Sequence, residues 1–159
     1  MDDAHMLVLD MGSRHYSCAQ IVMTGGLRLM GRDNPDLIRA MAGLAQGVGY
    51  SGEICGALAG GICLVALHTA KCTDDEETLP EARPLMNTLV EWFREEHCKG
   101  GAITCDALLA EERAGGDGVG AHGGMHAAIC GELVASVWNK TIVLLAENGI
   151  DPSLGREIR

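Results

Sequence analysis

The stretch SGEICGALAGGICLVALHT, residues 51–69, consists of apolar and small residues and predicts a buried helix capped by Ser51. Gly52, Gly56 and Gly60 recur every four residues, so in a helix they lie on one face and form a narrow ridge. Glycine in a helix costs about 1 kcal/mol relative to alanine. The ridge therefore indicates either close packing of another helix or the approach of a cofactor to the backbone.

Composition favours the same class of fold along the whole chain. The 159 residues are 47% hydrophobic, but only 3% are aromatic, and 8 are methionine. A core with so few aromatic rings is filled by aliphatic side chains, methionine and alanine, which suits closely packed helices. The apolar stretch is shorter than the roughly 20 residues that a membrane-spanning helix needs, so we expect no membrane contact. The length predicts a single domain over residues 1–159.

Working outward, the chain predicts an all-α, compact bundle of five to six helices whose core spans residues 13–147. The expected helices run from His15 to Leu29 after a Ser13 cap, from Pro35 to a stop at Gly47, from Ser51 to Thr69, from Pro80 or Pro84 to a stop at Gly100, over a short turn capped by Thr104, and from Met125 to Asn148. Residues 1–12 are expected to form a poorly determined lead-in, and residues 114–124 a glycine-rich linker. Strand signals are scarce because alternating apolar and polar runs are absent.

Net charge and cysteine usage restrict the possible partners and the compartment. The formal net charge of −10 argues against nucleic acid and against anionic membrane surfaces, and leaves basic proteins as possible partners. The acidic start Met1-Asp2-Asp3 does not resemble a secretory signal, so we expect a cytoplasmic protein. An odd number of cysteines, 7, indicates metal or redox use rather than a disulfide scaffold.

Four cysteines stand at or near the predicted start of a helix: Cys18, Cys55, Cys105 and Cys130. The exposed N–H groups and the dipole of a helix start stabilise negative charge, so this position favours the thiolate. Thiolates that are scattered in the sequence but meet in the fold would form a site that binds metal or reacts with disulfides. No Cys-x-x-Cys pair is present, which argues against thioredoxin-like and zinc-ribbon proteins.

The remaining cysteines have other expected roles. Cys63 is expected to fill the core, and Cys72, beside an acidic loop, to be an incidental surface thiol. Cys98 lies seven residues before Cys105 and could pair with it or replace it as a ligand.

Other chemistry-bearing patterns are weak. His122 and His126 are separated by glycines, which favours a solvated linker over a zinc site. No hydrolase, phosphate-loop or dinucleotide motif is present, so we expect no enzyme by itself, although a component of an oxidoreductase fits.

Four pieces of the sequence, in order, resemble a known family. They are the Cys18 segment, the glycine-rich Cys55 segment, the segment Ile103-Thr104-Cys105 after Trp92-Phe93, and Cys130-Gly131-Glu132. The chain resembles, over residues 13–147, the small redox-associated C_GCAxxG_C_C proteins. The central piece departs from the family's spelling, since it reads Cys55-Gly56-Ala57 rather than Gly-Cys-Ala.

The resemblance implies an all-helical domain of redox function, and such domains are similar to one found joined to c-type haem segments in anaerobic bacteria. It suggests an iron–sulfur cluster held by Cys18, Cys55, Cys105 and Cys130, with Cys98, Gly56 and Gly60 as possible additions. Four thiolates are the usual complement of such a cluster. Such a protein would be an electron carrier or accessory module with a redox protein partner. Two alternatives stay open: a cofactor-free thiol–disulfide protein, and a non-catalytic interaction module that uses an exposed glycine ridge. A homodimer sharing that ridge is a further hypothesis.

Overall fold

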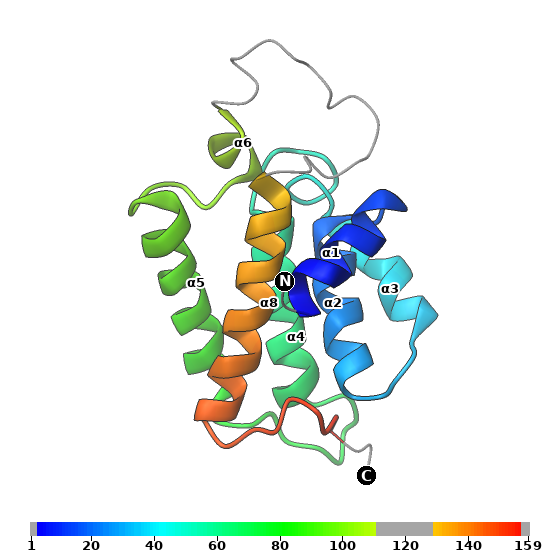
Figure 1. Cartoon of the computed structure of the whole chain (residues 1–159). Coiled ribbons are helices and arrows are strands. Elements are labelled where there is room, and N and C mark those ends of the chain that lie inside the picture. Colours follow the sequence, from blue (N-terminus) through cyan, green and yellow to red (C-terminus); the bar gives the residue numbers. More distant parts are fainter. Residues whose placement is uncertain (1–2, 111–128, 157–159) are drawn as a thin grey trace.

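The computed structural model describes residues 3–110 and 129–156, and nearly all of their regular structure is helical (Figure 1). The elements are α1 (Asp3–Ser13), α2 (Cys18–Leu29), α3 (Pro35–Met41), the 3₁₀ turn η1 (Ala42–Leu44), α4 (Gly56–Thr69), α5 (Ala82–Cys98), α6 (Cys105–Leu108) and α8 (Ile129–Glu147). The all-α prediction is confirmed. The predicted number of helices is wrong, because the described ranges alone contain seven α-helices rather than five or six.

The additional helix is α1, in the segment expected to be a lead-in. Its buried residues Ala4, Val8 and Met11 are spaced for one helical face, and α1 packs on α8 and α2. The prediction was wrong because the apolar run Met6 to Leu9 is short, and the packing partners of α1 come from distant parts of the chain. A Ser13 cap and a start at His15 were also wrong predictions for the next helix. His15 has a left-handed φ of 64°, and α2 begins only at Cys18.

Two expected helix boundaries are confirmed by their capping hydrogen bonds. The Leu37 N–H donates to Oδ1 of Asn34 at 3.0 Å, directly before Pro35. The Ala107 N–H donates to Oγ1 of Thr104 at 3.3 Å, at the start of α6. The end of α4 at Thr69 is also as predicted.

Other boundaries differ from the predictions. Helix α3 ends at Met41, before the expected Gly47 stop, and α4 begins at Gly56 rather than after Ser51. Gly52 therefore lies outside the helix, with a φ of 79°. The expected linker at 114–124, the start of the last helix at 125, and both His122 and His126 lie outside the described residues.

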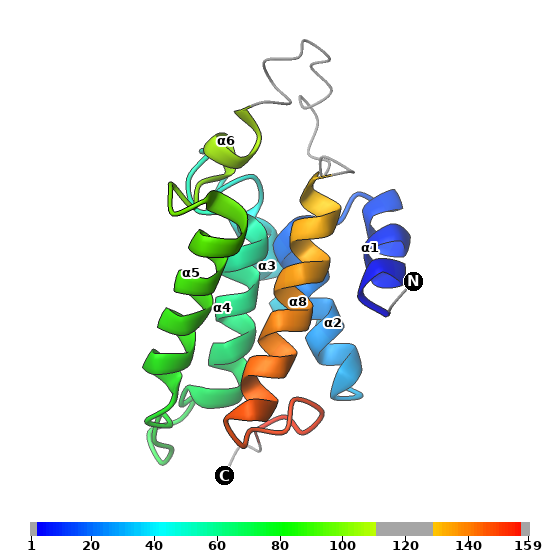
Figure 2. The same ribbon diagram turned by 60° about the vertical axis from the view of Figure 1, so that its left-hand side comes forward.

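Helix α4 is the centre of the bundle and packs against α2, α5 and α8 (Figures 1 and 2). A Cβ on Gly60 would lie 2.9 Å from the Cα of Ala19 in α2. A Cβ on Gly61 would lie 2.6 Å from Cγ1 of Val137 in α8. The glycines of α4 thus allow two neighbouring helices to approach its backbone. Because this ridge is buried within the chain, the prediction of an exposed ridge that binds a partner or a second copy is wrong.

Three long helices begin at the same end of the bundle. Both views show α2, α4 and α8 starting at the end where α6 lies, whereas α5 runs in the opposite direction (Figures 1 and 2). The C-terminal segment lies at the other end. The starts of α2, α4 and α8 therefore lie at the same end of the bundle as α6.

Helix α8 is apolar along much of its length. By length and composition it could cross a membrane, and it is the one such helix in the described part of the chain. Half of its apolar stretch is buried in the bundle, where α8 packs against α1, α2, α4 and α5. A core helix of a helical bundle has the same character, and this packing accounts for the composition of α8.

Replacing Gly60 with alanine tests the close approach of α2 and α4. The added methyl group must displace the backbone at Ala19, which costs roughly 1–3 kcal/mol, while the higher helix propensity of alanine returns about 1 kcal/mol. We expect Gly60→Ala to lower the free energy of urea-induced unfolding. Gly43→Ala is the matched control, because nothing lies within 4 Å of a Cβ at Gly43. Equal stabilities of the two variants would contradict the proposed packing role.

Candidate functional site

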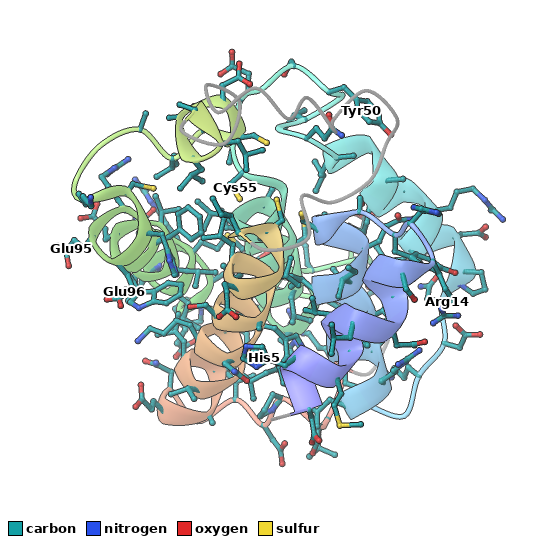
Figure 3. The ribbon with its side chains drawn as sticks, turned by 45° about the horizontal axis from the view of Figure 1, so that its top comes forward. His5, Arg14, Tyr50, Cys55, Glu95 and Glu96 are labelled. Atoms are coloured by element: carbon teal, nitrogen blue, oxygen red, sulfur yellow. The ribbon has the colours of Figure 1, made fainter. Side chains whose placement is uncertain are left out.

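The four cysteines at helix starts line one cavity at the α6 end of the bundle. The cavity contains about 430 Å³ of space not filled by atoms, including the part that opens to solvent. Its lining residues are Cys18, Gln46, Cys55, Gly56, Ala57, Cys105, Leu108, Leu109, Cys130 and Leu133. Apart from the cysteines, the lining is almost entirely apolar. Figure 3 looks onto this end of the molecule and shows several sulfur atoms near the labelled Cys55.

Each of these cysteines lies in the first turn of its helix or directly before it. Cys18 and Cys105 are the first residues of α2 and α6, Cys55 is the residue before α4, and Cys130 is the second residue described in α8. Cys55, Cys105 and Cys130 are buried, with exposed fractions of 5%, 8% and 7%. Cys18 is half-buried. The structure thus brings together thiols from four segments that are distant in the sequence.

A short antiparallel pairing joins the segments that carry Cys55 and Cys105. The Cys55 N–H donates to the Ile103 carbonyl at 2.9 Å, and the Cys105 N–H donates to the Glu53 carbonyl at 2.6 Å. Ile54 and Thr104 form the bridge between them. These bonds fix the position of α6 relative to the start of α4. This pairing could not be predicted from the sequence, because each segment is too short to show alternation.

The thiols of Cys18 and Cys130 contact each other directly. A hydrogen bond between them is the largest cause that raises the pKa of Cys18 well above the usual range, and burial and the other thiols add to it. Negative charge on one of these sulfur atoms therefore disfavours negative charge on its neighbours. In the absence of a bound cation, Cys18 is therefore held as a thiol.

The expectation that helix starts favour thiolates is wrong for Cys18 and Cys55 in the metal-free site. The backbone N–H groups of Ala57 and Leu58 do lower the pKa of Cys55, as a helix start should. Burial has the larger effect, and together with the charges of Cys130 and Cys105 it raises the pKa of Cys55 to about 11. The position of a cysteine at a helix start is visible in the sequence, whereas the loss of water around the sulfur atoms depends on the folded arrangement.

A strained turn before α4 contributes one more residue to the cavity. Five consecutive residues, 46–50, have positive φ values between 48° and 79°. Three of them are not glycine: Gln46, Val48 and Tyr50. Left-handed backbone costs roughly 1–2 kcal/mol per L-residue, so this turn needs support from its surroundings. Gln46 lines the cavity, whereas the labelled Tyr50 is exposed on the surface (Figure 3).

Gln46 is a residue of the cavity that the sequence does not predict. The glycines at 47 and 49 are typical of a helix stop, and no sequence pattern indicates that the neighbouring side chain lines a site. The closely spaced glycines at 47, 49 and 52 were the available signal for a left-handed turn, because glycine adopts positive φ without strain.

The other three cysteines and Gly60 do not line this cavity. Cys63 was expected to fill the core. It lies in α4 and packs against the core, but its side chain is only half-buried. Cys72 is exposed, and its thiol lies 3.5 Å from Oε1 of Glu76, which raises its pKa. Cys98, at the end of α5, is half-buried, and burial raises its pKa. Within the described residues, no three His, Cys, Asp or Glu side chains are arranged to hold a single metal ion.

The raised pKa of Cys55 predicts that stability falls in alkaline solution. In the unfolded chain this thiol ionises near its ordinary value of 9.0, whereas in the folded, metal-free protein it stays protonated up to about 11. Between these values the unfolded state binds fewer protons, so the free energy of unfolding decreases as pH rises. A difference of two pKa units corresponds to about 3 kcal/mol. Urea unfolding of the reduced protein between pH 8 and 11 should show this loss, and Cys55→Ala should reduce it. Parallel curves for both proteins would contradict the assignment.

Comparison with known proteins places the chain in a family. No curated protein and no solved structure matches it. A family model described as "Putative redox-active protein (C_GCAxxG_C_C)" matches residues 16–144, a range that contains all four cysteines of the cavity. This match covers most of the chain and confirms the resemblance seen in the sequence. The chain belongs to the C_GCAxxG_C_C family of redox-active proteins.

Proposed function

We propose that this protein binds an iron–sulfur cluster through Cys18, Cys55, Cys105 and Cys130 and transfers electrons to or from a partner protein. The observation that carries the proposal is the convergence of these four thiols on one cavity. Four cysteine thiolates are the usual ligand set of [2Fe–2S] and [4Fe–4S] clusters. When bound, the cluster would supply one-electron chemistry, which these side chains lack as separate thiols.

The surroundings of the thiols suit an anionic metal–thiolate group. The starts of α2, α4 and α8 lie at this end of the bundle, and their positive dipole ends favour negative charge. The N–H groups of Ala57 and Leu58 already stabilise charge on Cys55. Leu108, Leu109 and Leu133 make the wall of the cavity apolar. Water exclusion and hydrogen bonding to sulfur are the means by which a protein tunes the potential of a cluster.

The raised thiol pKa values agree with a site intended for a cation. Four sulfur atoms that repel each other as thiolates become compatible once iron neutralises their charge. Binding must then release the thiol protons, so assembly of the cluster is expected to be favoured by higher pH. The absence of a preformed site for one metal ion among the described side chains does not oppose this proposal, because a cluster distributes its ligands over several iron atoms.

Anaerobic reconstitution tests the proposal. The reduced protein is incubated with ferrous iron and sulfide, desalted, and assayed for visible absorption, iron and acid-labile sulfide. We expect a brown protein with stoichiometric iron and sulfide, and loss of most of the colour in Cys55→Ser and Cys105→Ser. Cys63→Ser and Cys98→Ser are the matched controls, because these cysteines lie outside the cavity. A colourless wild-type protein, or equal loss in both groups, would contradict the proposal.

The direct contact between Cys18 and Cys130 supports a second candidate function in thiol–disulfide exchange. In that reaction the two thiols lose two electrons and two protons and form one S–S bond. A partner's disulfide takes up the electrons and protons and becomes two thiols. Mass spectrometry after treatment with glutathione disulfide should then find the Cys18–Cys130 peptide pair. A mixture of unrelated pairs, or none, would count against this function.

The partner and the compartment are part of the same proposal. The net charge of −10 favours a redox partner with a basic surface over nucleic acid, and the chemistry suits the reducing cytoplasm, where free thiols persist. A homodimer, if it forms, must use a surface other than the glycine ridge. Equilibrium sedimentation distinguishes a monomer from a dimer.

A further inference from the structure

We infer that Gln46 donates a hydrogen bond from its side-chain amide to an anionic sulfur atom when the cavity holds its cluster. This inference rests on the proposed function and assigns a positioning and tuning role to a residue outside the family's cysteine and glycine pattern. Four observations carry it: the polarity of the lining, the unsatisfied amide, the strained backbone, and the connection of that backbone to two of the cysteines.

Gln46 differs in chemistry from every other described residue of the lining. Beside the four cysteines, the described lining consists of glycine, alanine and leucine. Gln46 therefore supplies the one side-chain N–H donor that the described lining contains. Thiolate and sulfide sulfur accept hydrogen bonds, and a carboxamide donates two without adding charge.

The side-chain nitrogen of Gln46 is fully buried and, within the described part of the chain, has no hydrogen-bond partner. Leaving a buried donor unsatisfied costs roughly 1–3 kcal/mol. Such a cost at a cavity wall is understandable if the donor gains its partner when the cavity is filled. The unloaded protein then carries a small destabilisation that binding relieves.

The backbone around Gln46 is strained in a way that fixes its position. Gln46 has a φ of 48°, and the following residues continue in the left-handed region as far as Tyr50. Val48, with a φ of 62°, is β-branched and especially disfavoured there. Strained backbone of this kind persists only where the surrounding structure holds it, and it is concentrated at functional sites.

Hydrogen bonds hold the strained turn against the segment that carries Cys55. The Gly52 N–H donates to the Gln46 carbonyl at 3.0 Å, and the Glu53 N–H donates to the Gly47 carbonyl at 3.0 Å. The carbonyls of Gly52 and Glu53 in turn accept from the α6 start, including the Cys105 N–H. One continuous set of backbone bonds therefore sets the position of Gln46 relative to Cys55 and Cys105. A residue needed only to fill space would not require this constraint.

A hydrogen bond to cluster sulfur has a measurable electronic consequence. It stabilises the more negative, reduced state more than the oxidised state, so it raises the reduction potential. Removing the donor should shift the potential of the loaded protein to more negative values. The loss of this donor should not weaken the unloaded protein, because there the side-chain nitrogen has no partner to lose among the described residues.

The experiment compares three variants with the wild type: Gln46→Leu, Gln46→Glu and Thr24→Val. Leucine removes the donor at similar size, and glutamate keeps the shape but replaces the donor with negatively charged acceptors. Thr24→Val is the matched control, because it removes another buried, unpartnered polar atom that does not line the cavity. Each protein is reconstituted anaerobically, and the iron and sulfide content, the reduction potential and the urea stability of the unloaded form are measured.

The expected result separates the donor role from a structural one. Gln46→Leu should retain a cluster at a more negative potential, with an unloaded form at least as stable as the wild type. Gln46→Glu should lose a larger fraction of its cluster, and Thr24→Val should keep the wild-type potential. A wild-type potential in Gln46→Leu, or a less stable unloaded form with no change in potential, would overturn the inference while leaving the proposed function intact. Failure of the wild type to assemble a cluster would overturn the proposed function and this inference together.

Discussion

The close approach of α2 to α4 at Gly60 is the contact on which the cysteine cavity depends. Because Gly60 has no side chain, the backbone of α2 at Ala19 can lie directly against α4, where a Cβ would be 2.9 Å from the Ala19 Cα. One turn earlier, a Cβ at Gly56 would lie 2.8 Å from the Leu44 carbonyl oxygen and 3.7 Å from the Cβ of Cys18. The two glycines thus set how the helices lie side by side. Cys18 and the N-terminal end of α4 are brought together as a consequence.

Bringing thiols together in an apolar cavity has an electrostatic cost that the metal-free fold avoids by keeping them protonated. Burial raises the pKa of Cys55 even though two backbone N–H groups at the start of α4 oppose the shift. The contact between Cys18 and Cys130 acts in the same direction. A bound metal centre would reverse the balance, since its positive charge makes thiolates favourable and the helix dipoles then add to that effect. The same closeness that disfavours charge on these thiols without metal would let them act together as ligands with metal.

Local sequence signals predicted the local structure, and long-range contacts determined the rest. The start of α3 at Pro35, the cap at Thr104 and the end of α4 at Thr69 followed from residues within or next to these helices. The start of α4 did not, because the left-handed turn at 46–50 is held by bonds to residues 52 and 53, and these pair with α6. The grouping of the four cysteines was expected from the family resemblance. Their mutual effect on pKa and the presence of Gln46 required the folded arrangement.

Three departures from local rules lie together at the cavity, and this location is informative. They are a strained turn, an unsatisfied amide at Gln46 and thiols that disfavour one another's negative charge. Natural proteins break local rules mainly where function requires it, and they compensate with a stable scaffold elsewhere. Because the ligands come from four separate segments rather than from one Cys-x-x-Cys loop, the scaffold must fold before the site exists. A cluster bound there would stabilise contacts between helices, and the region that is least favourable without it would gain most from its binding.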